Sequence, residues 1–396
     1  MKNVIIYSQQ ELFNSKTAAG NRMTKYAKAL ALMDCKVYIT SIHHSLEKSI
    51  VHEFSRNCYY LGNIDRDKQT MFSYIYRLKK IIDRLSGETV LLLYPYNNIL
   101  FEVLCFVFFK ILCKKSICVE VNERRIHYYD LYGINMGLLI FIKYKILRLS
   151  VLISEYTMKY YDGLIFISKN IENLYRKKYS IKNFIRIPIL CETVNVLPFT
   201  YLYDDSKSFE IAFSGQININ KENIDLLFYA LGVLLKEGYR IRINMYGPIT
   251  DEKKIHLLIE NNNLSDVVRL CGDLKYEEVM INLQKSHLLV VIRGNTMQNF
   301  YGFSTKLSDY LSTGVPVLVT DVSDVSEYLK DNVNAFVINP DSSAEIIKKI
   351  RYIINNYNQK AGYISKNAFR VVNNKFAYIL YKEKIDGLFF EKKRNI

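Results

Sequence analysis

Short apolar runs alternate with segments of helical periodicity along most of this chain of 396 residues. Near-continuous apolar runs predict strands that are buried on both faces, because a strand with one solvated face alternates apolar and polar positions. Strands that alternate with helices are typical of parallel sheets joined by helical crossovers. The pattern therefore predicts an α/β fold built on parallel sheets.

The alternation occurs in two series. In the first series we expect strands at 4–7, 36–41, 89–94, 116–121 and 163–167. A small-residue loop at 15–22, which contains Gly20, leads into a helix at 22–33. Ser168 has the residue type and position of an N-cap for a helix at 169–178.

The second series begins after a stretch that contains Pro188, Pro198 and a polar run. We expect strands at 209–214, 241–246, 267–270 and 287–292, and helices at 222–236, 275–285, 343–357 and 364–390. Proline-containing polar stretches are common between domains. The sequence therefore predicts a first domain at 1–187, a linker at 188–208 and a second domain at 209–374, with the C-terminal helix 375–396 packing back on the first domain.

The composition limits the classes of function. A hydrophobic fraction of 49% is ample for two cores, and the formal net charge of +15 indicates an anionic partner or ligand. The basic residues form only short clusters, such as 176–178, and no nucleic-acid-binding motif or long basic tail is present. These features exclude a dedicated nucleic-acid-binding protein and leave a phosphate-bearing ligand or an anionic membrane face.

The seven cysteines are scattered, with no C-x-x-C pair, so we expect buried free thiols in a reducing cytoplasm. The N-terminal residues lack the apolar segment of a signal peptide and read as a strand. The apolar run at 103–109 is too short to span a bilayer, so a buried or interfacial helix is expected.

The segment 134–153 mixes aliphatic residues with Lys143, Lys145 and Arg148. Apolar content with basic residues is typical of a helix that lies on an anionic membrane surface. A core helix of the first domain fits the same pattern. The two interpretations stay open at the level of sequence.

Residues 299–320 read NFYGFSTKLSDYLSTGVPVLVT and carry the strongest local signal. A small-residue loop runs into a helix that carries Lys306 and Asp309 and ends at Gly314. Unpaired N–H groups and the helix dipole both favour an anion at such a helix start. A cation in this first turn opposes the dipole, which fits a site that holds an anion. Asp309, one turn further on, is placed to hold ribose hydroxyls.

This segment resembles the donor-binding motif of retaining family-4 (group 1) glycosyltransferases of the GT-B fold. Gly302 and Phe303 fit the motif's Gly-rich turn, Asp309 takes its second acid, and 314–317 fit its Gly-x-Pro-Val close. The motif's first acid falls on Tyr301, which is a departure. The helix start, Thr305 to Tyr310, resembles a subgroup that reads Pro-x-Lys-Leu-x-Glu-Tyr.

A second element resembles the same family. Gly215 and Lys221 fit its Gly-Arg-x4-Lys element, in which Arg and Lys clamp the donor diphosphate, but Gln216 replaces the Arg. Arg293 lies at the end of the strand expected at 287–292, which precedes the main motif. It is placed to supply the missing cation. The first domain's start and residues 162–168 also resemble the family, so the resemblance covers nearly the whole chain.

The resemblance implies two Rossmann-like, doubly wound domains that face each other across a cleft. It also implies transfer of a hexose, with retention, from a nucleotide-diphosphate-sugar donor to a saccharide acceptor. We expect that acceptor in surface polysaccharide biosynthesis, and a lipid-linked form would suit a protein at the inner face of the cell membrane. We expect no organic cofactor, no metal and no nucleic acid as partner.

Glu123, after the strand at 116–121, is a candidate to orient the acceptor hydroxyl or act as a base, although an ion pair with Arg124 or Arg125 would explain it equally well. The candidate catalytic residues are Glu123, Lys221 and Arg293. The candidate donor-binding residues are Gly20, Gly215, Lys221, Arg293, Tyr301, Gly302, Phe303, Ser304, Thr305, Lys306 and Asp309. The lost acid and the lost Arg also allow a non-catalytic GT-B subunit or sugar-nucleotide-binding scaffold, and a membrane-docking partner protein is a third interpretation.

Overall fold

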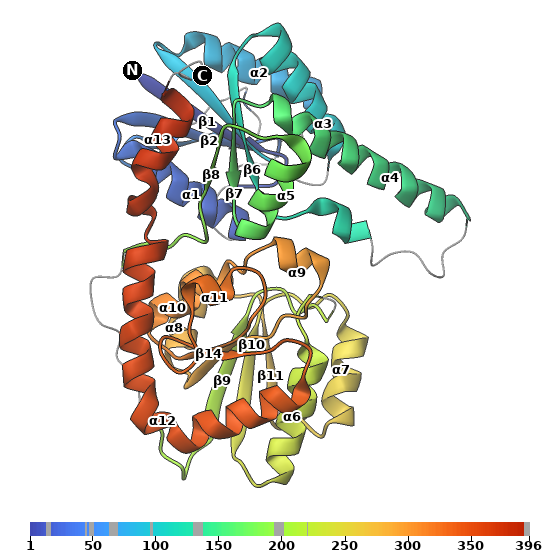
Figure 1. The fold of residues 1–396 in the computed structure, drawn as a ribbon, viewed down its shortest axis with the longest axis vertical. Helices are drawn as coiled ribbons and strands as arrows, with labels where there is room; N and C mark the ends of the chain where they lie inside the picture. The colour runs from blue at the N-terminus through green and yellow to red at the C-terminus, as the bar shows by residue number, and fades with distance from the viewer. Residues whose placement is uncertain are drawn as a thin grey trace. The chain divides into compact units, whose positions relative to one another are not determined.

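The computed structural model describes residues 1–12, 17–43, 46, 51–62, 70–95, 98–129, 138–193, 202–219 and 221–391. The chain divides into two compact units, Met1–Leu190 with Tyr378–Ile396, and Cys191–Ala377. Each unit contains a sheet with helices packed around it (Figure 1). Of the expected linker, residues 194–201 lie outside the described part, and 202–208 belong to the second unit. The C-terminal segment from Tyr378 belongs to the first unit.

The first unit has an eight-stranded sheet in the order β3-β4-β2-β1-β5-β6-β7-β8. Its strands are β1 (Lys2–Ser8), β2 (Cys35–Ser41), β3 (Val51–Ser55), β4 (Cys58–Leu61), β5 (Glu88–Tyr94), β6 (Ser116–Val121), β7 (Gly163–Phe166) and β8 (Phe184–Arg186). All neighbours pair in parallel except β3 and β4, which are antiparallel. The parallel sheet expected from the apolar runs is therefore confirmed.

The helices of the first unit are α1 (Ala18–Ala31), α2 (Met71–Arg84), α3 (Ile99–Cys105), η2 (Phe106–Leu112), η3 (Arg125–Tyr129), α4 (Leu138–Thr157), η4 (Met158–Tyr160), α5 (Lys169–Tyr179), η6 (Tyr378–Tyr381) and α13 (Lys382–Phe390). Ser168 is the N-cap of α5, and its hydroxyl accepts a hydrogen bond from the Ile171 N–H at 3.3 Å. The run 103–109 is helical, as expected, within α3 and η2.

The second unit has a six-stranded parallel sheet in the order β11-β10-β9-β12-β13-β14. Its strands are β9 (Phe209–Ser214), β10 (Ile241–Tyr246), β11 (Val268–Gly272), β12 (Leu288–Val291), β13 (Val317–Thr320) and β14 (Phe336–Ile338). Its helices are α6 (Ile224–Lys236), α7 (Glu252–Asn261), α8 (Tyr276–Gln284), α9 (Met297–Tyr301), α10 (Lys306–Thr313), α11 (Val325–Tyr328), α12 (Ser343–Val371) and η5 (Val372–Phe376). The strand order reverses between β9 and β12, and such a switch point is where doubly wound sheets bind ligands.

Two local expectations are wrong. Gly20 does not lie in a loop, because α1 begins at Ala18 and the Gly20 N–H donates to the Thr17 hydroxyl at 3.0 Å. The C-terminal helix is not continuous from 364 to 390: α12 runs to Val371 and α13 starts at Lys382. Residues 15 and 16 of the expected loop lie outside the described part.

Residues 138–153 of the segment 134–153 belong to α4, and residues 134–137 lie outside the described part. The packing of α4 bears on whether this segment is a core helix or a surface helix. Its C-terminal half packs inward: Ser154 donates to Glu102 at 2.9 Å, and Glu155 accepts from Tyr179 at 2.9 Å. The residues from 141 to 149 are exposed or half-buried. The core-helix interpretation therefore fits only the second half of α4. Among the described residues, no helix is both long and apolar enough to cross a membrane.

A buried ion pair fastens α1 to the centre of the first sheet. The Arg22 Nε lies 2.7 Å from Glu120 Oε1 on β6, and the Tyr26 hydroxyl donates to Glu120 Oε2 at 2.8 Å. The Arg22 guanidinium also donates to the carbonyl oxygens of Ile187, at 2.7 Å, and Pro188. Burial alone would lower the pKa of Arg22, but the charge of Glu120 raises it, whereas burial raises the pKa of Glu120 against the opposing effect of Arg22. Every charge here has a partner, as a buried charge requires.

We predict that Arg22→Met destabilises the protein by about 3–5 kcal/mol, because it leaves the carboxylate of Glu120 buried without its counter-charge. Urea unfolding followed by circular dichroism measures the change. The exposed pair of Lys79 and Asp83 on α2 is the matched control, and Lys79→Met should leave the unfolding midpoint where it is. Equal midpoints for the two variants would contradict the assignment.

Candidate functional site

The site is built at the carboxyl ends of β9 and β12, where the strand order of the second sheet reverses. Strand β9 ends at Ser214 and is followed by Gly215, whose φ is 112°. Strand β12 ends at Val291, and Arg293 follows two residues later. The Arg293 N–H donates to the Thr320 hydroxyl at 2.8 Å, which ties it to the end of β13. Two chain segments from neighbouring strands thus meet at one edge.

Helix α10 supplies the third segment, with the bounds that the sequence predicts. It starts at Lys306 after the loop of Gly302, Ser304 and Thr305, and its C-cap Gly314 has a left-handed φ of 79°. Thr305 makes no side-chain capping hydrogen bond. The Tyr310 hydroxyl accepts from the Ser214 N–H at 2.6 Å, so the helix is fastened to the end of β9.

Lys306, Arg293 and Glu222 form one charged cluster at this edge. The Lys306 Nζ lies 2.8 Å from Glu222 Oε1, and the Arg293 Nε lies 3.5 Å from the same oxygen. The Lys306 ammonium also lies 3.8 Å from the centroid of the Phe213 ring. The side chains are 16%, 13% and 3% exposed for Lys306, Arg293 and Glu222, so the cluster is largely desolvated.

The burial of these charges and their proximity to one another shift their pKa values. Burial lowers the pKa of Lys306 to about 8, although Glu222 raises it and Arg293 lowers it further. Burial raises the pKa of Glu222, but the positive charges of Lys306 and Arg293 outweigh burial and bring it below its ordinary value. Glu222 is therefore a carboxylate at neutral pH, held between cations. Oppositely charged groups are what allow buried charges to persist.

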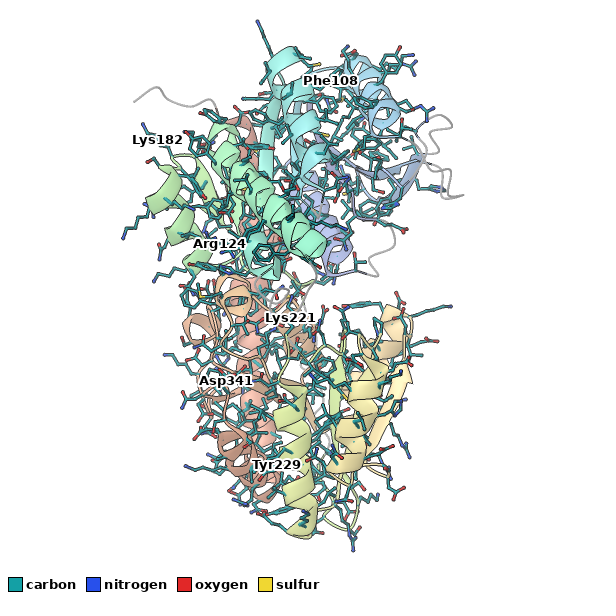
Figure 2. The ribbon with its side chains drawn as sticks, turned by 90° about the vertical axis from the view of Figure 1, so that its right-hand side faces the viewer. Phe108, Arg124, Lys182, Lys221, Tyr229 and Asp341 are labelled. Atoms are coloured by element: carbon teal, nitrogen blue, oxygen red, sulfur yellow. The ribbon has the colours of Figure 1, made fainter. Side chains whose placement is uncertain are left out.

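Lys221 precedes Glu222 in the turn that leads into α6. Its backbone carbonyl accepts a hydrogen bond from the Asn299 amide at 2.9 Å, and the same amide donates to the Gly294 carbonyl at 2.9 Å. Its positive charge acts on both Glu222 and Lys306. Figure 2 shows Lys221 at the end of the second unit where α6 begins and Tyr229 further along that helix. The structure thus brings Lys221, Arg293 and Lys306 to one edge of the sheet.

Other predicted donor residues have different surroundings. Asp309 faces α8, and its carboxylate accepts from the Tyr276 hydroxyl at 3.0 Å. Phe303 is 5% exposed and stacks on Tyr328, with ring centroids 5.6 Å apart, so its side chain belongs to the core. Tyr301 ends α9 and packs edge-on against the Phe300 ring at 5.1 Å.

Ser304 is buried in the loop before α10. It lines a cavity of about 10 Å³ together with Arg293 and Asn299. Within the described residues, Ser304 Oγ, Asn299 Oδ1 and Arg293 Nε are buried without a hydrogen-bond partner. The loop therefore presents its backbone, rather than the Ser304 side chain, at the start of α10.

Gly20 and Glu123 lie in the first unit. Gly20 is buried in α1, and a Cβ on it would meet the Leu12 carbonyl oxygen at 3.0 Å, so the glycine serves close packing. Glu123 follows β6 and is half-buried. Its charge, together with burial and Glu120, raises the pKa of the Tyr94 hydroxyl. Arg124 and Arg125 form ion pairs with Glu155 and Glu102, respectively.

Glu222 is the member of the charged cluster that sequence reasoning missed. Its neighbour Lys221 was found through its spacing from Gly215, whereas no motif marks the acid. A signal was present: three cations predicted at one site need a counter-charge when they are buried. Glu222 is the nearest carboxylate in the chain to any of them. Gln216, which replaces the family's Arg, is exposed.

We predict that Gly215→Ala destabilises the second unit through Lys306. A Cβ at Gly215 would lie 2.6 Å from Lys306 Cε, so the lysine must leave Glu222. Gly238→Ala is the matched control, because Gly238 has a positive φ of 91° but no atom within 4 Å of its Cβ position. We expect Gly215→Ala to cost about 1.5–3 kcal/mol more than Gly238→Ala in urea unfolding, as for a lost charged hydrogen bond. An equal cost would show that backbone strain alone acts at Gly215.

Among the described residues, no group of three or more His, Cys, Asp or Glu side chains could hold a metal ion. All seven cysteines are free, and five of them are buried, as expected, whereas Cys113 and Cys271 are only half-buried.

The comparisons with known proteins agree with this geometry. Residues 203–371 match the family described as glycosyl transferases group 1. No curated protein sequence matches the chain. Sucrose-phosphate synthase from Thermosynechococcus elongatus has a similar structure, with a TM-score of 0.74 and 13% identity over 98% of each chain.

Two ligand complexes are similar as well. A variant of S. aureus TarM in complex with fondaparinux, α-GlcNAc-glycerol and UDP has a TM-score of 0.70 and 12% identity, over 99% of this chain and 100% of that one. Anabaena HepE in complex with UDP has a TM-score of 0.64 and 13% identity, over 97% of this chain and 98% of that one. The expected α/β class with Rossmann-like sheets is confirmed, and the family match supports glycosyl transfer as the reaction class. The chain therefore has the GT-B fold, and residues 203–371 of its second unit match the group 1 glycosyl transferase family.

Proposed function

We propose that this protein is a hexosyltransferase that moves a sugar, with retention, from a nucleotide-diphosphate-sugar donor to a saccharide acceptor of surface polysaccharide biosynthesis. The observation that carries the proposal is the convergence of Lys306 and Arg293 at the switch point between β9 and β12. Doubly wound sheets bind their ligands at this place. The match of residues 203–371 to a glycosyltransferase family gives the reaction class.

The chemistry of sugar transfer explains why cations gather there. Breaking the bond between the sugar and the diphosphate develops negative charge on the leaving group. Lys221, Arg293 and Lys306 would stabilise that charge electrostatically, and their burial strengthens the effect. The backbone N–H groups at the start of α10 would add hydrogen bonds. Asp309 would hold the donor's ribose.

A nucleoside diphosphate is the donor fragment that the similar proteins favour. HepE and the TarM variant each form a complex with UDP, and the TarM variant also holds α-GlcNAc-glycerol. We extend this to the present chain as a proposal. In the first unit, Glu123 would orient the acceptor hydroxyl or accept its proton. We further propose that the cations replace a divalent metal on the diphosphate, so that transfer needs no cofactor.

A thermal-shift panel of UDP, GDP, ADP and their sugars, in excess EDTA, tests the donor proposal, because a ligand of the folded state raises its apparent stability. We expect the nucleotides of one nucleobase to raise the melting temperature more than the others do. Sugar transfer or slow donor hydrolysis in the same buffer would separate an enzyme from a binding scaffold. Binding that requires added magnesium or manganese would refute the metal-free proposal.

We predict that Lys221→Ala weakens binding of that nucleoside diphosphate by about 1–3 kcal/mol, the loss expected for a charge-assisted contact. Isothermal titration calorimetry measures the change. Lys236→Ala, at the other end of α6 and exposed, removes an equal charge away from the site and should bind as the parent does. Equal affinities for both variants would exclude Lys221 from the diphosphate site.

We also propose that the acceptor is lipid-linked and that α4 meets it on the inner face of the cell membrane. The exposed apolar side chains of α4 are Phe141, Ile142, Ile146, Leu149, Ile153 and Tyr156, each between 45% and 63% exposed. From Ile142 on they recur every three or four residues, so they form one stripe along the helix. Residues Val151, Ser154 and Glu155, on the opposite face, are buried. In Figure 1, α4 extends outward from the sheet of the first unit.

The positive charge of α4 favours an anionic lipid surface as the partner that covers this apolar stripe. Lys143 and Lys145 flank the stripe on its two sides. Arg148 lies in the same N-terminal half of α4, further round the helix from the stripe. Residues 138–153 contain no acid, and the next one, Glu155, is buried. An apolar stripe bordered by cations is typical of helices that lie in the membrane interface.

We predict that the protein binds vesicles of phosphatidylcholine with phosphatidylglycerol, and that binding falls as salt rises. Each basic residue near the headgroups contributes about 1 kcal/mol, which salt screens. Changing Lys143, Lys145 and Arg148 to Ser should reduce sedimentation with vesicles, and so should Ile146, Leu149 and Ile153 to Ser. The control changes the exposed Lys253, Lys254 and Lys285 to Ser. It removes three positive charges and so has the same net charge as the variant of Lys143, Lys145 and Arg148. If the control loses as much binding as the α4 variants, net charge alone acts and the stripe is not a docking face.

A further inference from the structure

We propose that Glu222 is a positioning residue of the donor site, which holds the side chain of Lys306 as a cation beside the place that the diphosphate takes. The inference rests on the proposed function, because it assigns a role within the same site. It goes beyond the cations themselves and concerns the anion that lies between them.

The geometry isolates one oxygen of Glu222 as the centre of the cluster. Oε1 lies 2.8 Å from the Lys306 Nζ and 3.5 Å from the Arg293 Nε. Oε2 is buried and, among the described residues, accepts no hydrogen bond. A backbone bridge from Glu222 to Arg293 holds their two segments side by side. The carboxylate is thus fixed by its cations and its backbone, not by a network that would serve packing alone.

Lys306 depends on this carboxylate for its charge. The groups that act on Lys306 from the surrounding segments are Glu222, Arg293 and Lys221, and Glu222 is the acid among them. Burial, Arg293 and Lys221 all lower the pKa of Lys306, and Glu222 opposes them, which leaves it at about 8. Without Glu222 no acid opposes burial, Arg293 and Lys221, so the pKa of Lys306 would fall below about 8.

Two other titratable groups lie near Lys306 on α10. Asp309 faces Tyr276 of α8. The pKa of Tyr310 is raised by burial, so the phenol stays neutral between pH 7 and 9. The loss of a proton from Lys306 is therefore the event that should change the charge of the cluster in that range.

A bound diphosphate favours the protonated lysine, so affinity is highest below the pKa of Lys306 in the free protein and falls as the pH rises through it. For the parent protein we expect UDP affinity to be level near pH 7 and to fall about tenfold or more above pH 8, the loss expected for one charged contact. In Glu222→Gln the fall should begin at lower pH, so that affinity at pH 7.5 is already about tenfold weaker and is recovered toward pH 6.5.

The experiment is calorimetric titration of the full chain with UDP from pH 6.5 to pH 9.5. Glu222→Asp, which keeps the charge, should retain the parent's pH profile. If Glu222→Gln fails to fold, Lys306→Met alone still tests the inference, because it should abolish the fall in affinity above pH 8. Glu237→Gln is the matched control: Glu237 pairs with Arg351 on the surface, and its loss should leave the profile unchanged. In a Lys306→Met background affinity should be weak and independent of pH above 7, and Glu222→Gln should add no further change in the profile.

The outcomes separate the inference from the proposed function. If the parent binds neither UDP nor another nucleoside diphosphate, the donor proposal fails. If the parent binds but Glu222→Gln weakens affinity equally at every pH, Glu222 has a structural role only and the inference is overturned. A shifted profile in Glu222→Gln, absent from Glu237→Gln and from the Lys306→Met background, supports it.

Discussion

Two cations cannot be held side by side in a desolvated place unless an anion lies between them, and the second unit depends on this constraint. Lys306 on α10 and Arg293 after β12 approach the same carboxylate oxygen of Glu222, which opens the segment before α6. Three segments that are distant in sequence therefore converge because of one buried charge. The Coulomb attraction between these groups is strong only because water is largely excluded. The same exclusion brings the pKa of Lys306 to about 8, where a small change in its surroundings alters its charge.

The first unit also buries a cation beside a carboxylate, and there every polar group of the pair has a hydrogen-bond partner. Arg22 and Glu120 are buried together, and the remaining donors of Arg22 are satisfied by the carbonyl oxygens of Ile187 and Pro188. The Tyr26 hydroxyl occupies the second oxygen of Glu120. A fully satisfied pair of this kind fixes the position of α1. By contrast, Glu222 leaves Oε2 without a hydrogen bond among the described residues, so its carboxylate is less completely satisfied than that of Glu120.

The sequence predicts the sheets well, because buried parallel strands are continuous apolar runs and each is bounded by a helical pattern. It misses β3 and β4, where Val51–Ser55 carries polar residues on an exposed edge strand and gives no apolar run. It places Gly20 in a loop because small residues are typical of loops, whereas Thr17 caps a helix that already includes Gly20. In the site, spacing finds Lys221, Lys306 and Arg293, but not Glu222. A motif records positions along the chain, and Glu222 acts through a contact to Lys306 across 84 residues that only the fold creates.

Helix α4 shows how one segment can carry two environments. The apolar stripe and the buried face lie on opposite sides of the same helix, so periodicity alone could not decide between a core helix and a surface helix. Ser154 and Glu155 anchor the second half through hydrogen bonds to Glu102 and Tyr179. That anchoring leaves the stripe around Ile146 and Leu149 exposed along the helix. Solvent exposure of such a stripe is costly unless something covers it. The exposed half of α4 carries cations and no acid, and an anionic lipid surface is the kind of partner that would cover such a stripe.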